Sequence, residues 1–120
     1  PDYEIVDEVT GKIGDVTVLA TRVDAKDNNQ LRQMMDDLKE KMEKAVIVLG
    51  AASDDKVMLC AGVTKDIVGG NYHAGNIVKS VAEQCGGKGG GRPDMAMAGA
   101  KEASKLEDAL NSVYDYVKSI

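Results

Sequence analysis

Residues 86–100 read Gly-Gly-Lys-Gly-Gly-Gly-Arg-Pro-Asp-Met-Ala-Met-Ala-Gly-Ala, and the rest of the chain is organised around this stretch. Five of its first six residues are glycine, which loses more conformational freedom on folding than any other residue. Because ordering so many glycines costs much conformational entropy, we infer that the structure or function requires residues without side chains here. Because the run lies between a predicted helix and a short apolar segment, we predict a functional loop joined to two rigid elements.

Regular patterns flank the glycine run on both sides. Upstream, apolar residues recur at helical spacing over residues 74–85, with Asn71 as a candidate N-cap and Gly86-Gly87 as a stop signal. Downstream, residues 95–100 predict a short strand of small residues. A capping-box pattern at residues 104–107 then predicts the start of a last amphipathic helix.

The N-terminal half predicts a sheet that is covered by helices. Residues 16–23 and 45–51 are nearly continuous apolar runs, which are typical of strands buried on both faces. Between them, apolar residues recur at helical spacing over residues 31–42, after a candidate cap at Asp27 or Asn28. The order strand, helix, strand predicts a right-handed crossover that makes the two strands parallel.

Two further segments complete the expected architecture. Residues 57–63 follow a turn signal at 53–55 and are expected to pair antiparallel with the strand before them. Residues 3–13 fit a helix face and a strand, so periodicity alone leaves them open. We therefore predict an α/β (α+β) fold, a mixed sheet of four to five strands with about three packed helices.

Length and composition bound the class of protein. A chain of 120 residues has the size of a single domain, and Pro1 in place of an initiator residue suggests a piece of a longer protein. No basic, apolar leader and no apolar run of ~18 residues is present, so no membrane partner is expected. Cys60 and Cys85 are expected to be reduced core thiols, and together with His73 they are too scattered to predict a metal site.

The charge is distributed unevenly along the chain. The formal net charge is −5, which by itself argues against a nucleic-acid partner. Residues 65–105 nevertheless carry six basic and four acidic residues, a local charge of +2. The acidic excess therefore lies away from the glycine run.

Two familiar nucleotide-binding loops do not fit the glycine run. A P-loop needs Ser or Thr after its lysine, but Lys88 is followed by Gly89. A dinucleotide fingerprint that starts at Gly87 would place Arg92 at its last glycine, and it would run from strand to helix, the reverse of the order predicted here. What remains is a flat backbone surface with an adjoining cation, which can meet phosphate or lie against a base or ribose.

The run from Gly86 to Gly99 resembles the signature of the C-terminal domains of alanyl-tRNA synthetases, which belong to the DHHA1 superfamily together with DHH-type phosphoesterases. The resemblance extends over nearly the whole chain, through residues 16–23, 36–39, 45–49, 63–66 and 73–76. It implies a DHHA1-like, cytoplasmic, tRNA-binding module that grips the outer corner of tRNA, where the D and T loops meet, and helps to couple aminoacylation with editing.

The resemblance also implies partners and boundaries. The partners would be tRNA, namely alanine tRNA, and the other domains of the parent synthetase, where ATP, Mg and Zn act; no cofactor is expected in this chain. Some family members dimerise, chiefly through an upstream helical segment. Residues 1–13 resemble a remnant of that segment, which favours helix there and leaves residues 14–120 as the globular domain.

Two other functions stay open beside tRNA binding. One is the substrate-binding domain of a DHH-type phosphoesterase, although Arg92 stands where those enzymes carry His and no upstream DHH metal ligands are present. The other is a dimerisation module without direct RNA contact. Met97 stands where many relatives have Gln, so we give it no binding role.

We predict no catalytic and no metal-binding residue, and an RNA-facing surface built from the glycine run and the helix before it. Its members are Gly87, Lys88, Gly89, Gly90, Gly91 and Arg92, with His73, Asn76 and Lys79 from the helix. Simpler roles compete at some of these sites: Gly86-Gly87 as a helix stop, and His73 as a residue that starts the helix. Asp94 is expected to be a structural partner for loop N–H groups, since no second carboxylate lies at a catalytic spacing.

Overall fold

The computed structural model describes residues 5–53, 56–69 and 72–119 of the chain. The described elements are six strands, three α-helices and a short 3₁₀ turn. In chain order they are β1 (Ile5–Ile13), β2 (Val16–Val23), α1 (Asn28–Lys41), β3 (Ala45–Ser53), β4 (Lys56–Val63), α2 (Ala74–Gln84), β5 (Lys88–Gly91), β6 (Met95–Ala100), η1 (Ala103–Lys105) and α3 (Leu106–Ser119).

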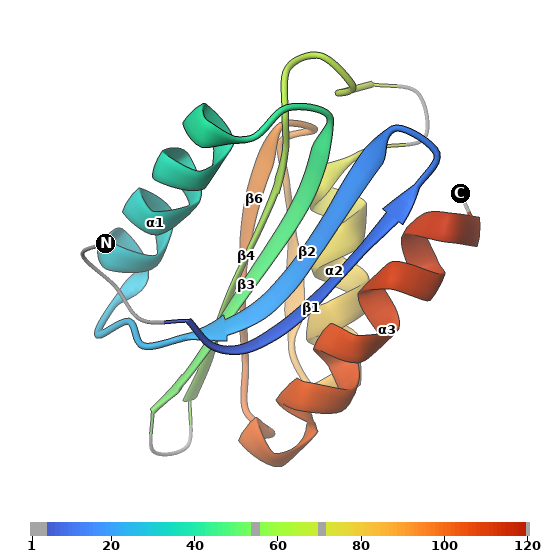
Figure 1. Cartoon of the computed structure of the whole chain (residues 1–120). Coiled ribbons are helices and arrows are strands. Elements are labelled where there is room, and N and C mark those ends of the chain that lie inside the picture. The colour runs from blue at the N-terminus through green and yellow to red at the C-terminus, as the bar shows by residue number, and fades with distance from the viewer. Residues whose placement is uncertain (1–4, 54–55, 70–71, 120) are drawn as a thin grey trace.

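The strands form one mixed sheet in the order β1-β2-β3-β4-β6-β5. Strands β2 and β3 are parallel and all other neighbours are antiparallel. The predicted α/β class, the parallel crossover around α1 and the β3–β4 hairpin are therefore confirmed. Figure 1 shows α1 on one side of the sheet and α2 with α3 on the other.

Each face of the sheet carries its own apolar core, because alternate residues of a strand point to opposite faces. In β3, Ile47 and Leu49 join the cluster under α1, whereas Val46 and Val48 join the cluster under α2 and α3. All four are fully buried. The two free cysteines are buried as well, as expected of core thiols.

Polar side chains begin two of the helices. Asp27 caps α1, because its Oδ1 accepts a hydrogen bond of 2.9 Å from the backbone N of Gln30. The expected cap at Asn71 lies outside the described residues, and His73 caps α2 instead. The capping box predicted from Ser104 does not form, since this residue lies in η1 and α3 starts only at Leu106.

Two sequence predictions were wrong at the level of elements. The helix favoured at the N-terminus is a strand over residues 5–13, because the chain reverses at Gly14, which has φ 61°, and pairs β1 with β2. The glycine run, predicted as a loop, is a strand over residues 88–91. These two strands bring the sheet to six. The division into residues 1–13 and 14–120 stays a prediction.

No helix of the described chain is long and apolar enough to span a membrane.

Candidate functional site

The glycine run forms β5, the outermost strand at one edge of the sheet. It pairs antiparallel with β6, so that Lys88 lies opposite Gly99 and Gly90 lies opposite Met97. Its outer edge faces none of the other described strands, and an edge strand leaves part of its backbone N–H and C=O groups unpaired. Bare backbone is thus placed at the border of the fold, next to Lys88.

Close packing explains three glycines of this region. A Cβ on Gly87 would lie 2.1 Å from the carbonyl oxygen of Gly99, and one on Gly89 would lie 2.4 Å from Cβ of Ala98. A Cβ on Gly75, in the first turn of α2, would lie 2.7 Å from the carbonyl oxygen of Gly91. Helix α2 therefore rests directly on the β5 backbone at Gly75, whereas a side chain at Gly87 or Gly89 would push against β6.

Backbone conformation, and not close packing, explains the glycines at positions 86 and 90. Gly86 ends α2 with φ 75°, and the N of Gly87 donates to the carbonyl oxygen of Ala82 at 2.8 Å. This is the left-handed helix stop that the sequence predicts. Gly90 has φ 157° and no atom within 4 Å of a built Cβ, so its backbone is open to solvent or to a ligand.

The turn from β5 to β6 is fastened to both helical layers. The N of Ala74 donates to the carbonyl oxygen of Pro93 at 2.8 Å, and Nζ of Lys39 donates to that of Asp94 at 3.0 Å. The Asp94 carboxylate pairs with Nε of Arg92 at 3.4 Å and with Nζ of Lys39 at 3.9 Å. Asp94 is structural as expected, but its carboxylate partners are these cations and not loop N–H groups.

The side chain of Lys88 points to the α1 side of the sheet. Opposed residues of an antiparallel pair share a face, and Gly99, opposite Lys88, shares its face with Met97 two residues before it. Met97 packs against the core cluster under α1, as does Met58 of β4. Helix α1 contacts β3 and β4. The described helices therefore leave the β6–β5 end of this face without a helix on it.

A groove of about 1170 Å³ lies on this open end of the sheet. We call it the lysine groove, because Lys56, Lys88 and Lys101 line it and none of its described lining residues is acidic. Its other lining residues are small, apolar or amide-bearing: Asn28, Val57, Met58, Gly86, Gly87, Met97, Ala98, Gly99 and Ala100. The arrangement combines three cations with a lining of mostly small and apolar residues.

Two of the three lysines were not predicted from the sequence. Lys56 starts β4 and Lys101 follows β6, and the register that pairs Val57 with Ala100 places them side by side, with Lys88 on the far side of β6 opposite Gly99. The signal that could have found them is that each lysine adjoins a predicted strand. Their proximity follows only from the β4–β6–β5 pairing, which periodicity does not reveal.

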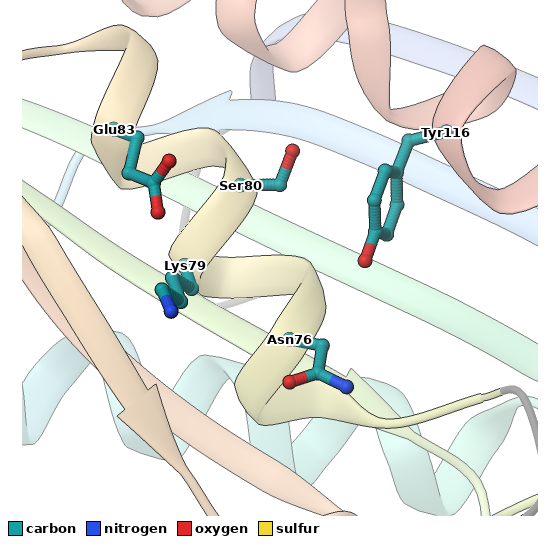
Figure 2. A pocket seen from close by; sticks show the side chains of 5 residues that line it. All are labelled: Asn76, Lys79, Ser80, Glu83 and Tyr116. Carbon is teal, nitrogen blue, oxygen red and sulfur yellow. The ribbon is translucent and has the colours of Figure 1, made fainter.

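The helical members of the predicted surface lie on the other side of the sheet. Asn76 and Lys79 are exposed on α2 and line a hollow of about 230 Å³ with Ser80, Glu83 and Tyr116 (Figure 2). The sheet separates this hollow from the lysine groove. The structure thus places Lys88 with the groove glycines, but it does not bring Asn76 and Lys79 to the same surface.

His73 and Arg92 line neither the lysine groove nor the hollow, so the structure does not bring them to the surface around Lys88. Nδ1 of His73 accepts a hydrogen bond of 3.2 Å from the N of Asn76, which is the helix-start role weighed against RNA contact. The Arg92 side chain is 76% exposed despite its pairing with Asp94. Its guanidinium is therefore accessible from the turn at the end of β5.

The described residues hold no group of three His, Cys, Asp or Glu side chains arranged to bind a metal ion. The chemistry that the lysine groove offers is anion contact by three ammonium groups, beside a backbone surface that planar groups can approach closely.

Comparison with known protein families identifies the one to which this chain belongs. The family model of the DHHA1 domain matches residues 15–119. The chain belongs to the DHHA1 domain family. The match includes the whole lysine groove and both sides of the sheet.

Relatives of this DHHA1 domain are alanine–tRNA ligases. The chain is 61% identical over 105 residues to that of Bacillus cytotoxicus, covering 88% of this chain and 12% of the relative. It is 59% identical over 115 residues to that of Bacillus subtilis, covering 96% of this chain and 13% of the relative. The DHHA1 domain thus spans about an eighth of the length of these relatives.

A solved structure shares the fold of this DHHA1 domain. The C-Ala domain of Aquifex aeolicus alanyl-tRNA synthetase superposes with a TM-score of 0.81 at 25% identity, over 92% of this chain and 98% of that chain. The resemblance to the C-terminal domains of alanyl-tRNA synthetases is confirmed by these similarities.

Proposed function

We propose that this chain is the tRNA-binding C-terminal domain of an alanine–tRNA ligase and that it grips the elbow of tRNA, where the D and T loops meet. The observation that carries the proposal is the lysine groove, a cationic surface with no acidic residue among its described lining, on a chain of net charge −5. The relatives of this chain are alanine–tRNA ligases, so the RNA that it would bind is alanine tRNA.

The groove suits the physical needs of elbow binding. Lysine at a phosphate adds affinity without reading sequence, so Lys56, Lys88 and Lys101 can follow a folded backbone. The outermost tertiary base pair of tRNA presents a flat face, and the floor of methionine, alanine and glycine lets such a face approach closely. Recognition of this kind depends on shape, as is common for folded RNA, and it requires no cofactor.

Within a parent ligase the same contact would connect two activities. A domain that holds the elbow restrains the whole tRNA while its acceptor end moves between aminoacylation and editing sites. The partners of this domain would then be alanine tRNA and the other domains of the enzyme. Because the chain covers 12% of its Bacillus cytotoxicus relative, those sites would lie elsewhere in the enzyme.

The test is the binding of transcribed alanine tRNA to this chain across a series of salt concentrations. We expect Lys56→Ala, Lys88→Ala and Lys101→Ala each to weaken binding and to flatten the slope of log K against log salt by about one unit. The matched control is Lys118→Ala, which removes an exposed lysine from the last turn of α3, on the other side of the sheet.

Three outcomes would contradict the proposal or its details. If all three groove variants still bind tRNA and the slope of log K against log salt does not change, the RNA binds elsewhere on the domain. Absence of tRNA binding by the unmodified chain would remove the function. Equal affinity for a tRNA and for an RNA hairpin that has no elbow would leave general RNA binding and refute elbow recognition.

A further inference from the structure

The hollow between α2 and α3 presents a set of polar side chains that have no task in the fold. Asn76, Lys79, Ser80 and Glu83 come from α2 at spacings of three and four residues, which place them on one exposed stripe. Tyr116 extends from α3 into the space beside α2, on the side to which Ser80 points (Figure 2). The hollow is thus walled by one aromatic ring and four hydrogen-bonding or charged groups.

A hydrogen bond between α2 and α3 holds together the two helices that form the hollow. One turn away, Nε2 of Gln84 donates to Oγ of Ser112 at 2.8 Å and links the two helices. The hydroxyl of Ser112 in turn donates to the carbonyl oxygen of Ala109 at 2.7 Å. Tyr116 is half-buried and packs against the core under the helices, so its ring is fixed before any ligand arrives.

The polar groups of the hollow are uncommitted. Within the described chain, the amide of Asn76, the ammonium of Lys79, the carboxylate of Glu83 and the hydroxyl of Tyr116 form no hydrogen bond or ion pair. Lys79 and Glu83 are four residues apart on the helix and still do not pair. Ser80 and Asn76 extend from α2 toward the side where Tyr116 lies, whereas Lys79 and Glu83 lie farther from the ring along the same hollow (Figure 2).

We infer that this hollow is a binding site for an unstacked nucleotide. A fixed aromatic ring offers stacking to any base, the Asn76 amide can pair with a base edge in two hydrogen bonds, and Lys79 can meet the phosphate. Glu83 accepts from base N–H groups and offsets the charge of Lys79, so a simple anion gains little here. A free phosphate or an acidic peptide lacks the planar ring that Tyr116 would hold.

This site is separate from the lysine groove. The sheet lies between the two surfaces, so a single base can occupy the hollow without contact to Lys56, Lys88 or Lys101. The inference goes beyond tRNA gripping by the groove, and it stands or falls independently of that function.

The test titrates the ¹⁵N-labelled chain with adenosine, guanosine, cytidine and uridine monophosphates, and with ribose 5-phosphate as a ligand that lacks a base. We expect saturable shifts of the amide signals of Asn76, Ser80 and Tyr116 with at least one nucleotide, and no such shifts with ribose 5-phosphate. Equal shifts with ribose 5-phosphate would show an anion contact only and would overturn the inference. Shifts confined to β5 and β6 would also overturn it while leaving the groove function intact.

Variants of the chain isolate the two recognition elements. Tyr116→Leu should weaken nucleotide binding at least about fivefold by loss of stacking, whereas Tyr116→Phe, which keeps the ring, should bind within about twofold of the parent. Asn76→Ala should weaken binding and change the order of preference among the four nucleotides, and Asn111→Ala, an exposed asparagine of α3, is its control. Dispersed amide spectra verify folding of each variant. Unchanged affinity in folded Tyr116→Leu would refute the site.

Discussion

Gly75 is the residue through which α2 and β5 touch. A Cβ there would lie 2.7 Å from the carbonyl oxygen and 2.9 Å from the N of Gly91, and backbone atoms cannot rotate away as a flexible side chain can. We expect Gly75→Ala to lower the free energy of unfolding by about 1–3 kcal/mol, a typical cost of overpacking. Urea denaturation measures this change.

The matched control for Gly75→Ala is Gly99→Ala. A Cβ on Gly99 has only the carbonyl oxygen of Val57 within 4 Å, at 3.9 Å, and strand residues other than glycine favour this conformation. This variant should change stability by less than about 0.5 kcal/mol. Equal losses in the two variants would show that contact between α2 and β5 is not the cause.

Cys60 predicts how stability depends on alkaline pH. Burial, and after it the charge of Asp36, raises the pKa of its thiol from 9.0 to about 12. Above pH 9 the unfolded chain loses this proton and the native chain keeps it, so the contribution is complete below pH 9 and is lost as pH rises toward 12. Between pH 8 and 10, Cys60→Ala should remove about 1 kcal/mol of the fall in unfolding free energy. Urea denaturation at each pH measures the unfolding free energy. An equal fall in the unmodified chain and in Cys60→Ala would contradict this prediction.

Thr64 joins two elements, the end of β4 and the start of β3. Its buried hydroxyl accepts from the N of Ala45 at 2.9 Å and donates to the carboxylate of Asp66, whose other oxygen accepts from the N of Lys44. Thr64→Val keeps the shape but leaves the N–H of Ala45 without its partner. We expect a loss of about 1–3 kcal/mol in urea denaturation, and a much smaller loss for Thr64→Ser, which keeps the hydroxyl.

The same junction gives a second readout of Thr64→Val. The hydrogen bond from Thr64 is the largest cause that holds the pKa of Asp66 below 3.8. Stability from this carboxylate is present above its unfolded pKa and is lost as pH falls through the folded value. The variant should therefore show a higher Asp66 pKa by NMR titration and a weaker loss of stability in acid. An unchanged Asp66 pKa would mean that the hydroxyl does not act on it.

Elements with strong periodicity were predictable from the sequence, and those that depend on pairing were not. The α1 helix, its Asp27 cap and the β3–β4 hairpin follow from local patterns. Strand β5 does not, since glycine has a low strand propensity and the strand forms because β6 pairs with it and α2 rests on it. The sequence leaves helix and strand as alternatives for β1 for a similar reason, because only its pairing with β2 distinguishes it from a helix.

The residues of the candidate site also fall into those that the sequence predicts and those that only strand pairing reveals. Lys88 was predictable because it lies inside the glycine run, but Lys56 and Lys101 join it only through strand register. Asn76 and Lys79 were grouped with Lys88 because they are near it in sequence. A strand and a helix that pack on each other point their exposed side chains in opposite directions, which a linear reading cannot represent. The sequence therefore located the glycine run, but neither its strand structure nor the surface around it.

At the scale of the whole molecule, the α1 side of the fold carries charge of both signs at opposite ends. The lysine groove adjoins the start of β4 at Lys56. Beyond the other end of this strand, a second hollow is lined by Asp36, Glu40, Glu43 and Asp66, with Lys39 and Lys65 among them. Eight strand residues separate the ends by roughly 25 Å. An approaching RNA would meet a field that attracts it at one end and repels it at the other.

This arrangement predicts an effect of acidic residues that never touch RNA. Removal of two negative charges in Glu40→Gln/Glu43→Gln should speed tRNA association about two- to fivefold at 0.01 M ionic strength, where the Debye length of ~30 Å spans the distance to the groove. At 0.15 M the Debye length is ~8 Å, so the same variant should associate at the parent rate. Stopped-flow measurements at the two ionic strengths provide the comparison. A gain that persists at 0.15 M would mean that RNA lies directly over α1, and the docking surface would then extend beyond the groove. No gain at either ionic strength would show that the acidic end does not influence the approach.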